Sequence, residues 1–112
     1  MLELKNVTKI FNKGNKNELY ALKNVSLAVP DKDMLGIMGR SGSGKSTLLN
    51  IISFLNPHTS GNYIFDGIDS NTINKSKQNT LRATKIGVLL QDFGLIETET
   101  AINNVMLPMY FN

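Results

Sequence analysis

The sequence contains no cysteine and only one histidine among its 112 residues. Without cysteine, neither a disulfide framework nor a thiolate metal site is possible, and the single His58 excludes a histidine-rich metal cluster. The longest strongly apolar stretch, LLNIISFL, is too short to cross a bilayer, and the opening MLELK lacks the basic start and apolar core of a secretion signal. These absences are typical of a protein of a reducing compartment, so we predict a cytoplasmic location.

Charge gives little information about partners. The net charge is +3 and the isoelectric point is about 9.3, but the lysines are scattered and no aromatic residues alternate with them. We therefore expect no nucleic-acid partner. The hydrophobic fraction of 41% is ordinary for a globular protein, and the length suffices for one small domain with its own core.

Apolar periodicity predicts strands first and a helix afterwards. Two strands of an antiparallel pair are expected on either side of the polar loop NKGNKNE, with apolar positions at Leu2, Leu4, Val7, Leu22, Val25, Leu27 and Val29. The run MLGIM at 34–38 is almost wholly apolar, which favours a strand buried on both faces. From Lys45 the apolar residues follow helical spacing until Asn56-Pro57 ends the pattern.

Between the predicted strand and helix lies GRSGSGKST, residues 39–47, with the spacing of a phosphate-binding loop. Glycines at positions 39, 42 and 44 allow the backbone N–H groups to approach phosphate oxygens, and the helix N-terminus adds further amides. Lys45 is placed to reach the β and γ phosphates, and Ser46 to bind Mg²⁺. The alternative is a loop that only turns the chain, with Ser43 and Thr47 capping the helix.

Four segments, ALKNVSL, GRSGSGKSTLLNIIS, SGNYIFDG and KIGVLLQDF, closely resemble the first half of an ATP-binding cassette (ABC) ATPase, especially of the macrolide-exporter and lipoprotein-release type. The resemblance implies an α/β fold: a P-loop NTPase core with an antiparallel β subdomain, truncated before the helical subdomain. Residues 1–112 would form the N-terminal part of an ABC ATP-binding domain, comprising the strands of the β subdomain, the Walker A loop with its helix, and the Q-loop. The implied cofactors are ATP and Mg²⁺.

The resemblance also assigns roles to residues. Phe11 falls where the family stacks an aromatic ring on adenine, and Gln91 falls on the Q-loop glutamine, which touches Mg²⁺ and the attacking water and senses the membrane partner. Lys45 and Gln91 are thus the implied catalytic residues, Ser46 and Gln91 the implied metal ligands, and Thr47 the contact to the α phosphate. The implied nucleotide-binding residues are Phe11, Gly39, Ser41, Gly42, Ser43, Gly44, Lys45, Ser46 and Thr47. From the residues alone, Phe11 could instead be core, Tyr20 is a rival aromatic, and Gln91 could be an ordinary amide after the predicted buried strand IGVLL.

Two positions depart from the family pattern, and a third site resembles a family motif that belongs elsewhere in the chain. Arg40 stands where the family commonly has proline, and we expect its side chain to face solvent. Lys32 replaces a turn glycine, so either it adopts a positive φ at a cost of about 1 kcal/mol or the turn changes type. Asp66-Gly67 imitates a Walker B aspartate, yet an Asp-Gly pair between strand-like runs favours a hairpin turn.

The sequence stops at Asn112, before the family's LSGGQ-type signature, Walker B strand and switch histidine, which predicts a fragment or a truncated cassette. In the complete assembly the resemblance implies a transmembrane permease and a second cassette as partners, at the inner face of the cell membrane, and export of a peptide, lipoprotein or drug-like substrate. The stretch GLIETETAINNVMLP is similar to the loop of bacteriocin and peptide exporters, although an acidic surface loop that starts a helix explains it equally well. The alternatives are a module that binds nucleotide without hydrolysis and a soluble ABC ATPase of cell division or repair.

Overall fold

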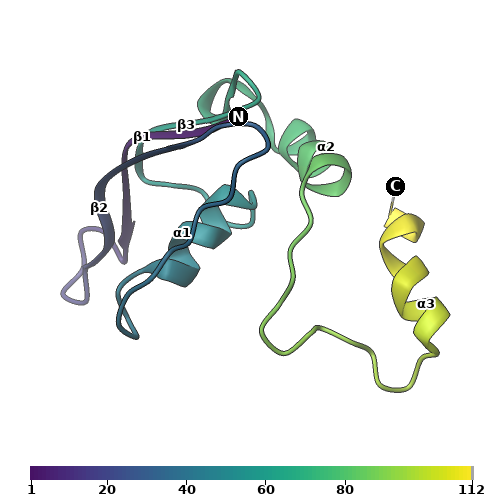
Figure 1. The fold of residues 1–112 in the computed structure, drawn as a ribbon. Helices are drawn as coiled ribbons and strands as arrows, with labels where there is room; N and C mark the ends of the chain where they lie inside the picture. The colour runs from purple at the N-terminus through teal and green to yellow at the C-terminus, as the bar shows by residue number, and fades with distance from the viewer. Residues whose placement is uncertain (112) are drawn as a thin grey trace. The chain divides into compact units, whose positions relative to one another are not determined.

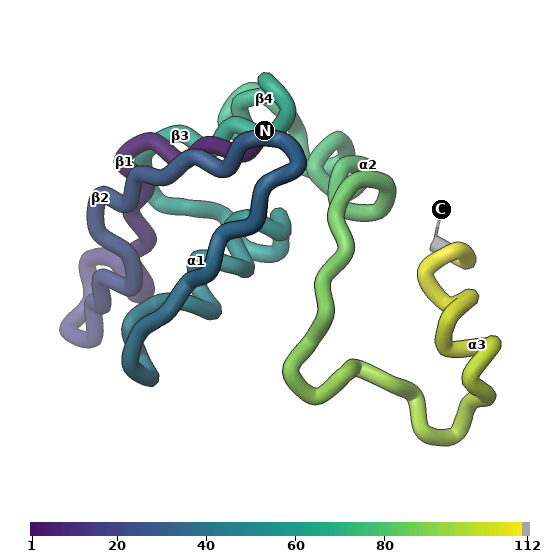
Figure 2. The backbone as a smooth tube through the Cα atoms, in the orientation of Figure 1, coloured from purple at the N-terminus to yellow at the C-terminus, as the bar shows by residue number. Residues whose placement is uncertain are grey.

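A computed structural model describes residues 1–111 of the chain, which fall into a first unit, Met1–Asn74, and a second unit, Lys75–Asn112. The first unit contains a four-stranded antiparallel sheet with the strand order β2-β1-β3-β4 (Figure 2). Its strands are β1 (Leu2–Phe11), β2 (Leu19–Val29), β3 (Ser60–Phe65) and β4 (Ile68–Asp69). Helix α1 (Lys45–Ile52) lies between β2 and β3 in the chain, and the short η1 (Ser70–Thr72) follows β4 (Figure 1). The predicted antiparallel pairing of the first two strands is confirmed.

Two turns match the predictions from the sequence. Asp66 and Gly67 connect β3 to β4 with φ of 48° and 78°, which is the hairpin conformation expected of an Asp-Gly pair. Lys32 has a φ of 61°, so the turn after β2 keeps its left-handed residue although the side chain is not glycine.

The register between β1 and β2 shifts at three places, and the first two shifts, one from an extra residue in each strand, compensate each other. Asn6 and Asn24 lie at these positions, both with a φ of 49°. The backbone N–H of Asn6 donates to Ser26 Oγ at 2.9 Å, and that of Asn24 donates to Thr8 Oγ1 at 3.0 Å. Because each bulge shifts the side-chain alternation by one, the apolar residues on both sides of it stay on the inner face.

The core of the first unit lies between the sheet and α1, which Figure 1 shows beneath the strands. Its most buried side chains, each 1% exposed or less, are Leu4, Val7, Ile51 and Tyr63. The Phe54 ring contacts the rings of Tyr63 and Phe65, with centroids 5.0 Å and 6.2 Å away. Helix α1 ends at Ile52, a turn earlier than the apolar spacing predicts, because Phe54 adopts a left-handed φ of 55° and turns its ring toward β3.

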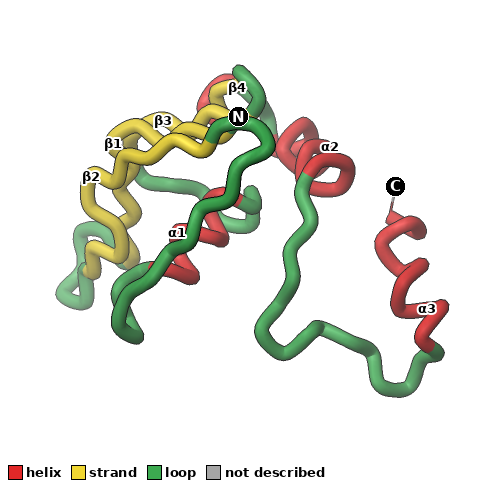
Figure 3. Tube along the Cα trace, viewed as in Figure 1, coloured by secondary structure: helices red, strands yellow, loops and turns green. Residues whose placement is uncertain are grey.

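The predicted buried strands MLGIM and IGVLL are wrong. Residues 34–38 and 86–90 are irregular, and Met34, Met38 and Leu89 are 92%, 96% and 85% exposed. Figure 3 shows the first of these segments as part of the long loop between β2 and α1. A parallel strand depends on hydrogen bonds from neighbours on both sides, and within the described residues neither segment has a paired neighbour.

The second unit consists of two α-helices, an irregular segment and a short terminal turn. Helix α2 spans Lys75–Lys85 and α3 spans Ala101–Met106, after which η2 covers Leu107–Phe111. Thr100 caps α3 by accepting a hydrogen bond from Asn103 N at 3.2 Å, so the predicted start of a helix after the acidic stretch is confirmed. None of the helices in residues 1–111 is both long and apolar enough to cross a membrane.

Candidate phosphate-binding site

The eight sequence-predicted residues between 39 and 47 lie on one loop and on the first turn of α1, within the first unit. Gly42 and Gly44 have φ of 81° and 98°, and Ser43 N donates to Arg40 O at 3.1 Å to close the turn. These left-handed residues coil the backbone around its own N–H groups, as a phosphate cradle requires. Arg40 is exposed, as predicted for its side chain.

Gly44 fixes this loop against the sheet. A Cβ at position 44 would overlap the carbonyl oxygen of Ala21 and lie 3.0 Å from Leu22 Cδ2. Ala21 itself lies at a register shift in β2, where the bulge turns its carbonyl out of the ladder with β1. The loop at 39–47 therefore depends on glycine at position 44 for close packing as well as for its φ.

The ammonium group of Lys45 lies across the loop. Its Nζ donates to Gly39 O at 2.6 Å, to Arg40 O at 2.7 Å and to Ser43 Oγ at 3.3 Å. Gly39 packs closely against the Ser43 side chain: a Cβ at position 39 would lie only 2.6 Å from Ser43 Oγ. The carbonyl oxygens of the loop thus hold the one cationic side chain of α1 over the turn.

Among residues 1–111, the first backbone N–H groups of α1 have no backbone acceptor. Gly44 is the N-cap and provides no side-chain hydrogen bond, and the first turn contains no acidic residue. The first helical hydrogen bond of α1 runs from Leu48 N to Gly44 O at 2.9 Å. The helical N–H groups that precede Leu48 therefore lack intrahelical acceptors. Within the described residues no side chain caps the start of α1, so the capping roles considered for Ser43 and Thr47 are not observed. Together with Lys45, these amides make this end of the helix electropositive.

The hydroxyl of Ser46 fits the chemistry of a Mg²⁺ ligand. Ser46 is exposed in the first turn of α1, next to Lys45, and its oxygen has no hydrogen-bond partner among residues 1–111. An unengaged oxygen beside a phosphate cradle suits a magnesium ion that is held mainly by phosphates and water. No group of three acidic, histidine or cysteine side chains able to hold a metal ion occurs among the described residues.

Phe11 lies at the end of β1 and is 37% exposed, so it is not a core residue in this structure. The register pairs Lys9 with Leu22 and Phe11 with Leu19. Residues two apart in a strand, and residues paired across strands, share a face of the sheet. Phe11 therefore lies on the same face as Leu22, which is the face that Gly44 approaches.

The rival aromatic, Tyr20, lies on the other face. It pairs with Ile10, which precedes Phe11 by one residue and hence projects from the opposite side of β1. Tyr20 is 52% exposed, and the ammonium of Lys23 lies 5.8 Å from its ring centroid. The sequence alone does not decide between Phe11 and Tyr20, but the geometry of the first unit places the two rings on opposite faces of the sheet.

Gln91 belongs to the second unit, in the irregular segment between α2 and α3, and its side chain is exposed. It does not follow a buried strand, contrary to the prediction for residues 86–90. The segment after it is anchored by Asn104 of α3, a residue that the sequence reading missed. Asn104 Nδ2 donates to Thr100 O at 3.0 Å and to Ile96 O at 3.1 Å, while Asn104 Oδ1 accepts from Ile96 N at 2.8 Å.

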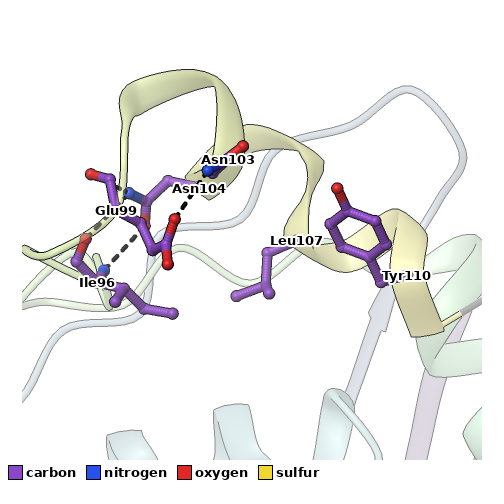
Figure 4. A pocket seen from close by; sticks show the side chains of 6 residues that line it. All are labelled: Ile96, Glu99, Asn103, Asn104, Leu107 and Tyr110. Carbon is purple, nitrogen blue, oxygen red and sulfur yellow. Dashed lines mark hydrogen bonds between the residues drawn. The ribbon is translucent and has the colours of Figure 1, made fainter.

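The same part of the second unit forms a pocket of about 270 Å³ (Figure 4). Asn103 Nδ2 donates to a carboxylate oxygen of Glu99 at 2.8 Å on one side of it, and Leu107 and Tyr110 provide apolar surface. Six side chains line this pocket: Ile96, Glu99, Asn103, Asn104, Leu107 and Tyr110. None of the predicted site residues is among them.

Comparisons with known proteins match this description. The family model described as "ABC transporter" matches residues 22–109. Among curated proteins, the chain is 45% identical over 111 residues to the uncharacterized ABC transporter ATP-binding protein MJ0796 of Methanocaldococcus jannaschii, covering 99% of this chain and 47% of that protein. It is 39% identical to the macrolide export ATP-binding/permease protein MacB of Mannheimia succiniciproducens, covering 99% of this chain and 17% of MacB. It is 38% identical to the methionine import ATP-binding protein MetN of Vibrio cholerae, covering 97% of this chain and 31% of MetN.

Solved structures agree with the sequence comparisons. The dimeric structure of MJ0796, a bacterial ABC transporter cassette, superposes with a TM-score of 0.89 at 45% identity, covering 99% of this chain and 47% of the other. A second structure, of a post-hydrolysis state of MJ0796 bound to ADP and phosphate, superposes with a TM-score of 0.88. The chain therefore spans about half or less of the length of these relatives.

Proposed function

We propose, since this chain belongs to the ABC transporter family, that residues 39–47 hold the phosphates of MgATP as the nucleotide-binding part of an ABC export complex. One observation supports this most strongly: Lys45 Nζ donates to the carbonyl oxygens of Gly39 and Arg40 at 2.6 and 2.7 Å, which holds the cation on the loop that leads into α1. Because the ammonium group is already held in place, it can bind a polyphosphate with little further loss of side-chain entropy.

Each residue of the loop has a role in this proposal. The amides of the glycine-rich turn and of the first turn of α1 donate to the phosphate oxygens, and Lys45 neutralises charge at the β and γ phosphates. Ser46 provides a hydroxyl ligand to Mg²⁺, and Thr47 contacts the α phosphate. Gly39, Ser41, Gly42, Ser43 and Gly44 shape the cradle.

Phe11 is proposed to stack on adenine, and Gln91 to bind Mg²⁺ and the attacking water. The exposed ring of Phe11 lies on the face of the sheet that Gly44 approaches, which supports its role over that of Tyr20. For Gln91 the support is chemical, because a neutral amide can act as a metal ligand and as a hydrogen-bond donor at once. Its exposure leaves that amide accessible.

In the complete protein, the proposed partners are a second cassette and a transmembrane permease, at the inner face of the cell membrane. The dimeric structure of MJ0796 supports the first, and the combined ATP-binding/permease protein MacB supports the second. The relatives include the macrolide exporter MacB and the importer MetN at 39% and 38% identity. Sequence identity therefore does not decide the direction of transport. We propose export of a peptide, lipoprotein or drug-like substrate, and the segment GLIETETAINNVMLP, similar to the loop of peptide exporters, favours the peptide.

The location of nucleotide can be tested by amide NMR, since the chain is only 12.4 kDa. Addition of MgATP should shift the backbone amides of residues 42–47 and of Phe11, in a saturable manner. The amides of Asn103 and Asn104, which belong to the pocket of the second unit, serve as internal controls. Shifts confined to that pocket, or no saturable shift, would rule out the proposed site.

A further inference from the structure

We infer that Lys9 positions the Phe11 ring for the base of the nucleotide, and so contributes to base binding without touching the phosphates. The inference rests on the proposed function, in which Phe11 stacks on adenine. Lys9 Nζ lies over the Phe11 ring, 5.1 Å from its centroid. A cation over an aromatic face is attracted by the ring quadrupole, which favours the ring orientation that keeps the two groups together.

Lys9 is itself anchored at its far end. Its Nζ donates to Pro57 O at 2.7 Å, in the segment that follows α1. The same segment is bound to β1 through Thr59, whose Oγ1 accepts from Ile10 N at 2.9 Å and whose N donates to Thr8 O at 2.8 Å. The ammonium group is therefore held between the ring and a fixed carbonyl, although the lysine side chain is otherwise flexible.

This arrangement matters because Phe11 lies at the very end of β1, where packing restrains a side chain least. The residue is 37% exposed, so part of the ring is free of the packing that would select one rotamer. Stacking on a base requires one orientation of the ring, so a free ring would lose entropy on binding. With Lys9 on one face, the base stacks on the opposite face of a ring that is already oriented.

The chain contains a matched control. Lys23 lies over Tyr20 at 5.8 Å in a similar cation–aromatic pair, but Tyr20 lies on the face of the sheet opposite to Phe11. Lys9→Met and Lys23→Met remove the same charge from the same strand pair. Only Lys9→Met should weaken nucleotide binding. Lys9→Arg, which keeps both the cation and the hydrogen-bond donor, should bind MgATP as the unaltered protein does.

The test compares MgATP with magnesium tripolyphosphate, which carries the phosphates but no base, by calorimetric titration of the same samples. Lys9→Met should weaken MgATP binding by about two- to fivefold, the range of an exposed cation–aromatic pair, and leave tripolyphosphate binding unchanged. Because Lys9 acts through Phe11, Lys9→Met should have no further effect on MgATP when Phe11 is already alanine. Comparing two ligands on one sample removes the influence of any misfolded fraction.

The outcomes separate the two proposals. Unchanged MgATP binding in Lys9→Met, an equal loss for both ligands, or an equal loss in Lys23→Met would overturn the role of Lys9 and leave the phosphate loop intact. A full additional loss in the Phe11→Ala background would also overturn it. If the unaltered protein bound neither MgATP nor tripolyphosphate, the proposed function would fail, and the role of Lys9 with it.

Discussion

Gly44 combines two constraints at one residue, since its φ of 98° is left-handed and its Cα lies against the Ala21 carbonyl of β2. Gly42 has a similar φ of 81°, but a Cβ there would meet nothing within 4 Å. Comparing substitutions at the two glycines therefore distinguishes the cost of a left-handed φ from the cost of a steric overlap. Gly44, at the end of the loop, packs against the sheet, whereas Gly42, in the middle of the loop, does not.

We predict that Gly42→Ala lowers the free energy of unfolding by about 1 kcal/mol, the cost of a left-handed φ in alanine. Gly44→Ala should lower it by more than about 2 kcal/mol, because the new methyl group also displaces the loop from β2. Urea unfolding of both variants measures the difference. Equal losses would show that Gly44 does not carry the contact between loop and sheet.

Phe11 and Tyr20 give a second comparison of single residues. Phe11→Ala should weaken MgATP binding by about 1–3 kcal/mol, the range of base–aromatic stacking, while Phe11→Tyr should be nearly neutral. Tyr20→Ala should have a smaller effect, because the register places Tyr20 on the opposite face. Titration with a fluorescent ATP analogue measures all three variants. Unchanged affinity in folded Phe11→Ala protein would assign stacking to another residue.

At the scale of elements, Tyr63 ties α1 to the sheet. Its ring is buried on β3, and its hydroxyl donates to Ile52 O, the last carbonyl of α1, at 2.7 Å. Burial raises the pKa of Tyr63, with a smaller contribution from the negative charge of Asp66, so the phenol remains a protonated donor. The helix is thus held at both ends, by Gly44 at its N-terminus and by Tyr63 at its C-terminus.

Tyr63→Phe should therefore lower the free energy of unfolding by about 0.5–1.5 kcal/mol, through loss of this hydrogen bond with little change in packing. Tyr20→Phe is the control, since Tyr20 is half exposed and has no such bond among the described residues. Chemical denaturation of the two variants provides the comparison. An equal effect in both would mean that the Tyr63 hydroxyl does not anchor α1.

The sequence predicted local features of the elements better than non-local ones. The first strand pair, the Asp-Gly hairpin and the glycine-rich turn before α1 depend on alternation and turn residues that are adjacent in the chain. The segments 34–38 and 86–90 were predicted as strands because they are apolar, but a parallel strand also needs partners, and none pairs with them in residues 1–111.

The two compensating bulges were missed although a signal for them was present. The repeated tetrapeptides KNVT and KNVS mark the two compensating bulges, since asparagine tolerates the left-handed conformation that each bulge requires. The role of Asn104 in holding the segment 96–100 could not be read from spacing, because it depends on a side-chain amide reaching several backbone groups at once.

At the scale of the whole molecule, the chain spans 47% of MJ0796, and the proposed ATP hydrolysis belongs to the complete protein. Hydrolysis requires a group that orients or deprotonates the attacking water. The loop at 39–47 contains no acidic residue, and the amide of Gln91 cannot act as a base near neutral pH. The 112-residue polypeptide should therefore bind MgATP without turnover.

Phosphate release measured on this polypeptide should not exceed background, whereas a chain extended to the length of its relatives should hydrolyse ATP. Lys45→Ala in both forms is the control for contaminating ATPase, since it removes the cation at the β and γ phosphates. Turnover by the short polypeptide that disappears in its Lys45→Ala variant would contradict the requirement for the remaining part of the cassette.

The central claim is that the loop at 39–47 binds the phosphates of ATP through Lys45, and calorimetric titration of MgATP into the unaltered protein, Lys45→Ala and Arg40→Ala tests it most directly. Lys45→Ala should weaken binding roughly 10- to 100-fold, the cost of removing a charged hydrogen-bond donor, and Arg40→Ala by less than about threefold. Arg40 is the matched cation on the same loop, exposed and without a salt bridge in residues 1–111. Equal affinities in the unaltered protein and Lys45→Ala would contradict the account.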